Sequence, residues 1–591
     1  MLWQSNGKPK FGPILNLMQV TRARFKQCLR YCKNIESVAR ADSLARKYMS
    51  KDPKLFGKEI KCINKNSNPV SNSINGISGD NQIVDMWKTH YSDILNCNSD
   101  EKNKHHVTNF TSSISPQTNL LRITPDNVKD ATLSMKMGKS AGLDKLRAEN
   151  LIFAGGRLIV LLSILFNLIL IHGCVPTGLM ETVIVPIIKD KKKSISDKDN
   201  YRPIAITSVI SKVLENIILS YSSDNLHTTD NQFGFKPKLG TEMCVFAFKQ
   251  VIDYYKSNSS PVYICYLDAS KAFDRVNHWT LLSKLINRNI NVLIIRLLQC
   301  WYRQQAFCIR WGTSLSTKFY VSNGVRQGGI MSPILFNVYM DNLSMELNKS
   351  GIGCVINDSP VNHLMYADDM CILAPSVTGL QNLLNISAEY AQMNTIIFNE
   401  SKSKCMCIKP KNMSELYVPN VKLNHKNLVW VQLYKYLGVM MDSSCKDDTD
   451  IKRHIRGVYT RGNLIVNRFR NCSDDVKTRL FKTYCNSIYG GALWNNYTKP
   501  CYRKAKVAYN DIYRALFHIA RGVSMSNIYV TKGIDCFNVL ARKLVYSLWQ
   551  RLSKSSNSII STIFHCDHCL RHSLIVKKWK SLLHVHPDAS T

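Results

Sequence analysis

The sequence is short of acidic residues and has no apolar run long enough to cross a membrane. Its 591 residues include 42 Asp and Glu against 78 Lys and Arg, which gives a formal net charge of +36. The longest apolar run, residues 158–171, includes Asn167 and is well below the ~20 residues that a spanning helix needs. We therefore interpret this run as a buried helix. The charge imbalance predicts a polyanionic partner, either nucleic acid or an acidic membrane surface.

Features of secreted proteins are also missing from the sequence. The first eight residues lack the apolar core of a signal peptide. The 20 cysteines do not have the spacing of a disulfide framework, so we expect reduced thiols. These observations predict a protein of the nucleus and cytoplasm that is neither secreted nor inserted in a membrane.

Charge and polarity divide the chain into five predicted segments. Residues 1–66 carry fifteen Lys or Arg against four acids and have helical apolar spacing, which favours an RNA-binding helix over a merely solvated one. Residues 67–120 are interpreted as a linker with a short helix around Ile83 to Leu95, because residues 64–80 are rich in Asn, Ser and Gly and residues 96–118 are polar. Residues 121–442 alternate helical and strand patterns. Residues 443–530 are helical, basic and rich in aromatic residues, and 531–591 form a helical extension.

Two adjacent acids lie in the tetrapeptide Tyr366-Ala367-Asp368-Asp369, between two apolar runs. This pattern predicts a short β-hairpin with the acids at its tip. Carboxylates held at a strand end suit Mg²⁺, which prefers oxygen ligands, and phosphoryl transfer is the reaction that such a site implies. An isolated Asp pair in a solvated turn is common, so the pair needs support from elsewhere in the chain.

A third acid, Asp268, stands one hundred residues before Asp368 in a similar setting. It ends the apolar, β-branched and aromatic run 262–268, which predicts a strand. Between the two sites lies the glycine-containing segment 323–333, whose glycines allow close approach of a backbone to a ligand before a helix begins near Pro333.

The chain resembles the reverse transcriptases of non-LTR (LINE-type) retrotransposons over roughly residues 121–442. Eight blocks occur in the order found in that family, namely residues 139–144, 200–204, 232–235, 267–274, 324–328, 366–369, 399–403 and 436–438. The resemblance implies an α+β right-hand polymerase, with fingers before Tyr263, an antiparallel palm sheet that carries the acids, and a helical thumb after Tyr436.

The resemblance also implies roles for the acids. Asp268 and Asp368 are the expected ligands of two Mg²⁺ ions, with Mn²⁺ as a possible substitute. Asp369 is also expected to be a catalytic residue and metal ligand. Because adjacent strand residues point to opposite faces, the alternative is that Asp369 shapes the hairpin. Asp274 is interpreted as structural.

Five further residues match the nucleotide-binding positions of the family. Phe273 is expected beneath the incoming sugar, where it would exclude a 2′-hydroxyl, although without the motif it would be taken for a core aromatic residue. Gln327 and Gly328 are expected to line the nucleotide pocket. Arg202 and Lys189 are expected to hold the triphosphate.

Two residues have expected roles around the growing chain. Lys402 matches a basic residue placed to protonate the leaving pyrophosphate, although a surface lysine is an alternative. Tyr366 is expected to pack beside the primer end.

The implied function is RNA-directed DNA polymerase activity that extends a DNA 3′-hydroxyl at nicked target DNA, with an RNA template and deoxynucleoside triphosphates as partners. We expect no endonuclease in the first ~120 residues, which are few and basic. We expect no RNase H either, because residues 451–591 contain six Asp and no Glu. The oligomeric state is left open.

Other functions and a metal site remain as alternatives. A truncated or domesticated RNA-binding copy without turnover is the main rival, and an intron maturase or telomerase-like polymerase would share the palm. A membrane-surface protein is disfavoured because no strongly apolar amphipathic helix is present. Residues 565–572 hold a His and Cys cluster, but no second Cys pair lies nearby, so we do not predict zinc there.

Overall fold

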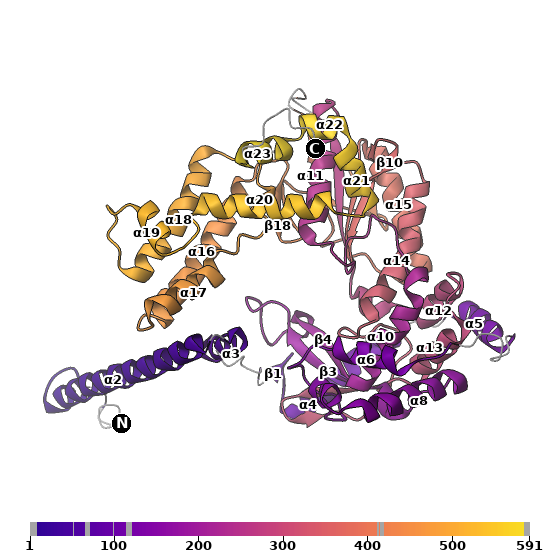
Figure 1. The fold of residues 1–591 in the computed structure, drawn as a ribbon, viewed down its shortest axis with the longest axis horizontal. Coiled ribbons are helices and arrows are strands. Elements are labelled where there is room, and N and C mark those ends of the chain that lie inside the picture. The colour runs from indigo at the N-terminus through magenta and orange to yellow at the C-terminus, as the bar shows by residue number, and fades with distance from the viewer. Residues whose placement is uncertain are drawn as a thin grey trace.

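The structure is a computed structural model of the whole chain. It describes residues 7, 9–50, 52–64, 71, 73–97, 100–113, 121–410, 413 and 419–583. In Figure 1 these residues form two arms joined at one side, with an opening between them. One arm holds the strands β3 and β4 with helices such as α8 and α10, and the other holds α11 and the helices after α16.

A five-stranded sheet forms the centre of the second arm, with the order β11-β12-β5-β13-β16. Its strands are β5 (Val262–Asp268), β11 (His363–Tyr366), β12 (Asp369–Ala374), β13 (Lys404–Ile408) and β16 (Val429–Trp430). All neighbours are antiparallel except β13 and β16, which are parallel. We call it the palm sheet.

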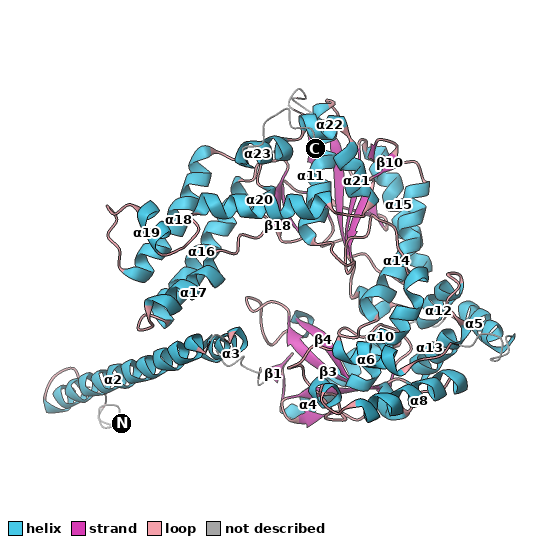
Figure 2. Cartoon of the chain, in the orientation of Figure 1, coloured by secondary structure: helices cyan, strands magenta, loops and turns pink. Residues whose placement is uncertain are grey.

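Both faces of the palm sheet are buried, because side chains of β5 alternate between two apolar cores. Tyr263, Cys265 and Leu267 join a core that includes α14 (Ser332–Lys349) and α15 (Val377–Met393). Val262, Ile264 and Tyr266 join a second core with α11 (Thr241–Ser257) and the C-terminal helices. Figure 2 shows the strands between these two groups of helices. A strand that is covered on both faces has a continuous apolar sequence, and β5 has such a sequence.

A second sheet lies in the first arm, with the order β4-β3-β6-β7 and β8 paired with β6. Its strands are β3 (Glu181–Ile188), β4 (Tyr201–Thr207), β6 (Ala306–Trp311), β7 (Ser314–Leu315) and β8 (Phe319–Tyr320). The helices of this arm are α4 (Asp80–Leu95), α5 (Glu101–Ser113), α6 (Pro125–Leu133), α7 (Ala148–Ile152), α8 (Gly156–His172), α9 (Thr177–Met180), α10 (Val209–Ser222), α12 (His278–Ile286) and α13 (Val292–Gln304).

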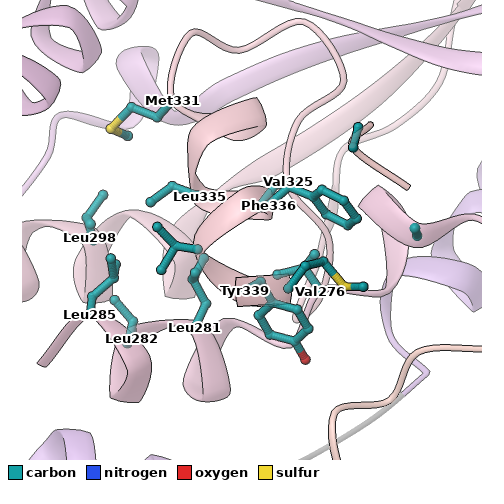
Figure 3. Packing of buried hydrophobic residues seen from close by; sticks show 14 of the residues in the cluster. Val276, Leu281, Leu282, Leu285, Leu298, Val325, Met331, Leu335, Phe336 and Tyr339 are labelled. Carbon is teal, nitrogen blue, oxygen red and sulfur yellow. The ribbon is translucent and has the colours of Figure 1, made fainter. Parts of the chain in front are cut away.

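Helices α12, α13 and α14 share one apolar contact region that joins the two arms (Figure 3). Leu281 and Leu285 of α12 and Leu298 of α13 meet Leu335 and Phe336 of α14 there. Close packing of this kind fixes the orientation of α14. Helix α14 begins at Ser332 with Pro333 in its first turn, which confirms the predicted helix start.

A third core holds the basic helical region after the palm together with the N-terminal helices. Helix α2 (Pro13–Met49) is mostly exposed, but Ala41 and Leu44 near its end pack into this core with Phe56 and Ile60 of α3 (Pro53–Asn64). The later helices are α16 (Asp448–Arg468), α17 (Asp474–Cys485), α18 (Lys499–Phe517), α19 (Met525–Thr531), α20 (Phe537–Ser553), α21 (Ser558–His565), α22 (Asp567–His572) and α23 (Leu574–Leu583).

Short hairpins and 3-10 turns complete the described structure. The hairpins are β1 (Ser73–Ile74) with β2 (Ile77–Ser78), β9 (Val355–Ile356) with β10 (Ser359–Pro360), β14 (Lys422–Leu423) with β15 (Lys426–Asn427), and β17 (Leu433–Tyr436) with β18 (Val439–Asp442). The turns are η2 (Lys198–Asn200), η3 (Ser223–Asn225), η4 (Ala272–Arg275) and η5 (Gly491–Leu493). The predicted α+β class is confirmed.

Two local expectations are corrected by the structure. Residues 158–171 are helical, but Leu161 and Ile171 are 63% and 55% exposed, so the predicted buried helix has one solvent-facing side. No helix among the described residues is both long and apolar enough to cross a bilayer.

The segment predicted as a linker also differs. Its described part holds α4 and α5, and Trp87 and Tyr91 of α4 are buried against the second sheet. Helix α4 lies where the short helix was expected, whereas polar composition hid α5, whose apolar residues are few. Residues 98, 99 and 114–120 of this segment lie outside the described residues.

Candidate active site

Three acids meet at one end of the palm sheet. Asp268 is the last residue of β5, Asp369 is the first residue of β12, and the two are direct partners in the antiparallel ladder. Asp368 lies in the two-residue turn that joins β11 to β12, where Ala367 has a φ of +58°. The predicted hairpin with acids at its tip is thus confirmed.

The segment 231–234 supports this turn from behind. The Phe233 N–H donates to the Met365 carbonyl, and the Met365 N–H donates to the Asn231 carbonyl, both at 2.8 Å. A Cβ added to Gly234 would collide with the Ala367 nitrogen, so only glycine allows this approach. The block 232–235 therefore packs against the acidic turn and holds it in place. Its sequence did not reveal this role.

The three acids influence one another electrostatically. Burial and the negative charge of Asp268 raise the pKa of Asp368, while Arg202 opposes the shift. Burial, Asp368 and Asp268 raise the pKa of Asp369 to about 6. Mutual repulsion of this kind is relieved when a cation binds between the carboxylates.

The donor set of these acids fits a magnesium ion. All three offer carboxylate oxygens, and Mg²⁺ in polymerases takes one or two carboxylates together with water and substrate phosphates. Among the described residues, no group of three or more His, Cys, Asp or Glu side chains is arranged as a complete metal site.

Lys402 lies beside Asp268. Its Nζ is 3.5 Å from Asp268 Oδ2, and the lysine side chain is 64% exposed. The block 399–403 is held to β5 because the Asn399 N–H donates to the Asp268 carbonyl at 2.8 Å and the Asp268 N–H donates to Ser403 Oγ at 3.2 Å. The structure brings Lys402 to the acids, and its role as a proton donor stays a prediction.

Phe273 and Asp274 lie in η4, close after Asp268. The Phe273 ring stacks on Phe336 at 4.4 Å between centroids and meets Phe235 edge-on at 6.2 Å. Asp274 is buried, which raises its pKa to about 6, and its Oδ1 accepts a 2.8 Å hydrogen bond from Gln327 Nε2. The side-chain N–H group of Gln327 is therefore already hydrogen-bonded to Asp274.

Gly328 has a φ of +125°, and a Cβ there would lie 2.7 Å from the Ala205 carbonyl oxygen. The Ala205 N–H donates to the Gln327 carbonyl at 2.8 Å, so this loop lies against β4. The close approach that the glycine permits is therefore to the chain's own backbone.

Glu215 holds the other end of this loop, and sequence reasoning missed it. Glu215 is fully buried on α10 and accepts hydrogen bonds from Arg326 Nη2 at 2.6 Å and from the Ile330 and Met331 N–H groups at 2.6 and 3.0 Å. The Arg326 guanidinium also lies 4.7 Å from the centre of the Trp301 ring. A buried pair with this many hydrogen bonds fixes the loop in one conformation.

Cations face the acids from the second sheet. Arg202 is exposed on β4, and Lys189 follows β3 directly, with its N–H bonded to the Asn200 carbonyl at 2.7 Å. Burial lowers the pKa of Lys189, and the positive charges of Arg202, Lys271 and Lys402 lower it further. Lys271, with a φ of +51°, is thus a fourth cation of the cluster. Its place within the block 267–274 was the available signal for it.

Tyr366 ends β11 and is half-buried against the second core. Near it, the Tyr489 hydroxyl donates to the Leu437 carbonyl at 2.7 Å, and the Tyr489 ring packs on Gly438. Tyr489 therefore contacts the β17–β18 hairpin close to Tyr366, the residue that precedes the acidic turn.

Comparison with known proteins agrees with this arrangement. The family model described as reverse transcriptase (RNA-dependent DNA polymerase) matches residues 189–441. The polymerase from mobile element jockey of Drosophila funebris is 25% identical over 410 residues, covering 65% of this chain and 43% of that protein. The type-1 retrotransposable element R2 polyprotein of Popillia japonica is 27% identical over 280 residues, covering 46% of this chain and 38% of that protein.

The chain spans less than half the length of these curated relatives. Among solved structures, the apo telomerase of Candida tropicalis aligns with a TM-score of 0.36 and 11% identity, over 69% of this chain and 68% of that one. The chain is thus similar, at low identity, to the reverse transcriptases of non-LTR retrotransposons, and its match to the reverse transcriptase family model lies in residues 189–441.

Proposed function

We propose that this chain is an RNA-directed DNA polymerase that extends a DNA 3′-hydroxyl on an RNA template, as in target-primed reverse transcription. The observation that carries the proposal is the meeting of Asp268, Asp368 and Asp369 at one sheet end, within the electrostatic reach of Arg202. A site with carboxylates that can bind metal ions on one side and cations that can bind phosphate on the other suits phosphoryl transfer.

Asp268 and Asp368 would hold two Mg²⁺ ions, or Mn²⁺ in their place, with Asp369 as a third oxygen donor. When bound, such ions favour the deprotonated 3′-hydroxyl and stabilise the charge on the leaving pyrophosphate. Gln232 and Gly234 would keep the turn that carries Asp368 in place, because the block 231–234 contacts both β11 and the turn.

The remaining residues would bind the nucleotide and the primer. Arg202 and Lys189 would bind the triphosphate, since guanidinium and ammonium groups pair with phosphate oxygens. Phe273 would limit space at the sugar, and its stacking on Phe336 would hold its ring in place. Lys402 would donate a proton to the pyrophosphate, and Tyr366 would contact the primer end.

Helix α2 would bind template RNA outside the candidate active site. It carries eight Lys or Arg against two acids, and only Ala41 and Leu44 of its residues are buried. An exposed helix with an excess of positive charge suits binding to a phosphate backbone. The protein would then act as part of a ribonucleoprotein in the nucleus and cytoplasm.

The test is primer extension with purified protein, Mg²⁺, an RNA template and an annealed DNA primer. We expect deoxynucleotide incorporation by the wild type and a loss of at least about 10²-fold for Asp268→Asn and Asp368→Asn, because each removes charge from the site. Asp475→Asn, which changes an exposed acid on α17, is the matched control and should keep full activity. Unchanged circular dichroism would show that the inactive variants are folded.

Full activity of either Asn variant would refute the metal assignment. Binding of RNA by a wild type that never extends a primer would favour the rival function of a non-catalytic RNA-binding protein. A salt titration of RNA affinity tests α2, because neutralised phosphates give a steep dependence on salt that Arg22→Gln with Arg24→Gln should reduce.

A further inference from the structure

A groove between α16 and α18 has an apolar floor and a cationic rim. It has a volume of about 840 Å³. Its lining is contributed by Thr449, Lys452, Ile455, Arg456 and Tyr459 of α16 and by Pro500, Arg503, Lys504 and Val507 of α18. It is formed by two helices of the third core and contains none of the acids of the candidate active site.

Contacts at two places along α16 and α18 fix the positions of the two helices that form the groove. Gly462 of α16 leaves no room for a Cβ against Ile512 of α18, so the helices approach closely there. At the other end, Thr498 Oγ1 donates to Asp448 Oδ1 at 2.6 Å. The lining residues of each helix fall three or four positions apart and therefore share one face.

The rim is positively charged and available to a ligand. Lys452, Arg456, Arg503 and Lys504 are all exposed. Within the described part of the chain, their side chains form no ion pair or hydrogen bond. Two carboxylates lie near the groove: Asp448 at one end, whose pKa is lowered despite burial, in part by the charge of Lys452, and Asp511, which contacts Tyr459 at 3.3 Å and Arg514 at 3.9 Å. Four unpaired cations facing one groove attract a polyanion.

The floor indicates which polyanion fits. Val507 is 44% exposed and Tyr459 is 36% exposed, so the groove that carries the four cations also presents apolar and aromatic surface. A duplex hides its bases and offers only phosphates, whereas a single strand can place bases on such a floor while its phosphates meet the rim. We propose that the α16–α18 groove binds single-stranded RNA, at a site separate from the candidate active site.

The test measures binding of a fluorescent single-stranded RNA of about ten nucleotides, a length that a groove of this kind covers. The full chain is first saturated with an unlabelled primer–template duplex so that the candidate active site is filled. We expect Arg503→Glu with Lys504→Glu to weaken RNA binding at least about tenfold. Lys554→Glu with Lys577→Glu removes the same charge from exposed positions on other helices and should change affinity little.

Equal binding by the groove variant and the control variant would overturn the proposal. Displacement of the probe by polyglutamate or duplex RNA as readily as by unlabelled single strand would also overturn it, because the groove would then recognise charge alone. Tyr459→Ala provides a second variant if the charge reversal unfolds the protein, and we expect a loss of about fivefold or more from one lost stacking contact. Primer extension on the preannealed duplex should stay at the wild-type level in these variants, so failure here is separable from failure of the polymerase proposal.

Discussion

The buried side-chain amide of Gln232 is hydrogen-bonded to both backbone groups of Ala367, the residue that precedes Asp368. The Ala367 N–H donates to Gln232 Oε1 at 2.9 Å, and Gln232 Nε2 donates to the Ala367 carbonyl at 3.4 Å. Oε1 also accepts the Gly234 N–H at 2.8 Å. One side chain thus fixes the turn that carries an acid of the active site.

Gln232→Met should lower polymerase activity far more than it lowers stability. The variant leaves the Ala367 N–H without its partner, which costs about 1–3 kcal/mol, and frees the turn to move. Gln250→Met is the matched control, since Gln250 is equally buried and its amide binds only Ser573 Oγ, at 2.9 Å. Primer extension per folded molecule and chemical denaturation measure the two effects. Similar activity in both variants would show that the turn does not need Gln232.

Gly328→Ala should impair nucleotide binding. Its φ of +125° is unfavourable for alanine, and the added Cβ would lie 2.7 Å from the Ala205 carbonyl, so the loop with Gln327 must shift. We expect KM for the nucleotide to rise about tenfold or more, because a small displacement at a binding loop has large effects. Gly522→Ala, at a position where no atom lies within 4 Å of the new Cβ, is the control. An unchanged KM would exclude this loop from the nucleotide pocket.

Asp369→Asn should stabilise the protein at neutral pH. The pKa of Asp369 is raised to about 6 by burial and by Asp368 and Asp268, so the folded protein binds this proton more tightly than the unfolded chain does. The ionised carboxylate therefore destabilises the fold, and this cost is complete above about pH 6, shrinks as the pH falls towards about 4, and disappears below about pH 3, where both states are protonated. Thermal melting should show a higher midpoint for the variant at about pH 7.5 and a much smaller difference at about pH 4.

The same melting experiment can report on cations. Mg²⁺ or Mn²⁺ should raise the midpoint of the wild type at about pH 7.5, because a ligand that binds only the folded state stabilises it. Asp268→Asn should lose this response. A melting advantage of Asp369→Asn that persisted at low pH would contradict the electrostatic explanation.

Phe273→Val should allow ribonucleotides to be incorporated. The smaller side chain opens space where a 2′-hydroxyl would otherwise clash, and discrimination by a steric pocket of this kind is worth about 10–200-fold. The ratio of ribonucleotide to deoxynucleotide incorporation measures the effect. Phe319→Leu, a change in the core of the second sheet, is the control for general loosening. An unchanged ratio would return Phe273 to the status of a core aromatic residue.

Much of the candidate site could be predicted from local sequence. The hairpin 363–374 followed from two apolar runs around an acidic turn, and the strand ending at Asp268 followed from its apolar, β-branched residues. Pro333 marked the start of α14 because proline fits the first helical turn. Each of these features depends on neighbours in the chain, which is why the sequence reveals them.

Other features depend on contacts between distant segments. Nothing near Gln232 in the chain shows that its amide binds Ala367, and nothing near Glu215 shows that it holds residues 326–331. The apolar run 158–171 was taken for a buried helix because composition does not show which face has a partner. Helix α5 of the predicted linker was missed for the same reason, since Val107 is buried only against another segment.

The sequence by itself determined the acids at strand ends, the basic charge and the family resemblance, which in turn implied the α+β class, because periodicity, residue type and spacing are local properties. Only the tertiary structure decided that Asp369 faces Asp268 across the sheet, that Lys271 joins the cations, and that a cationic groove opens between α16 and α18. These relationships depend on how strands and helices pack, and packing follows from the fit of side chains far apart in the chain.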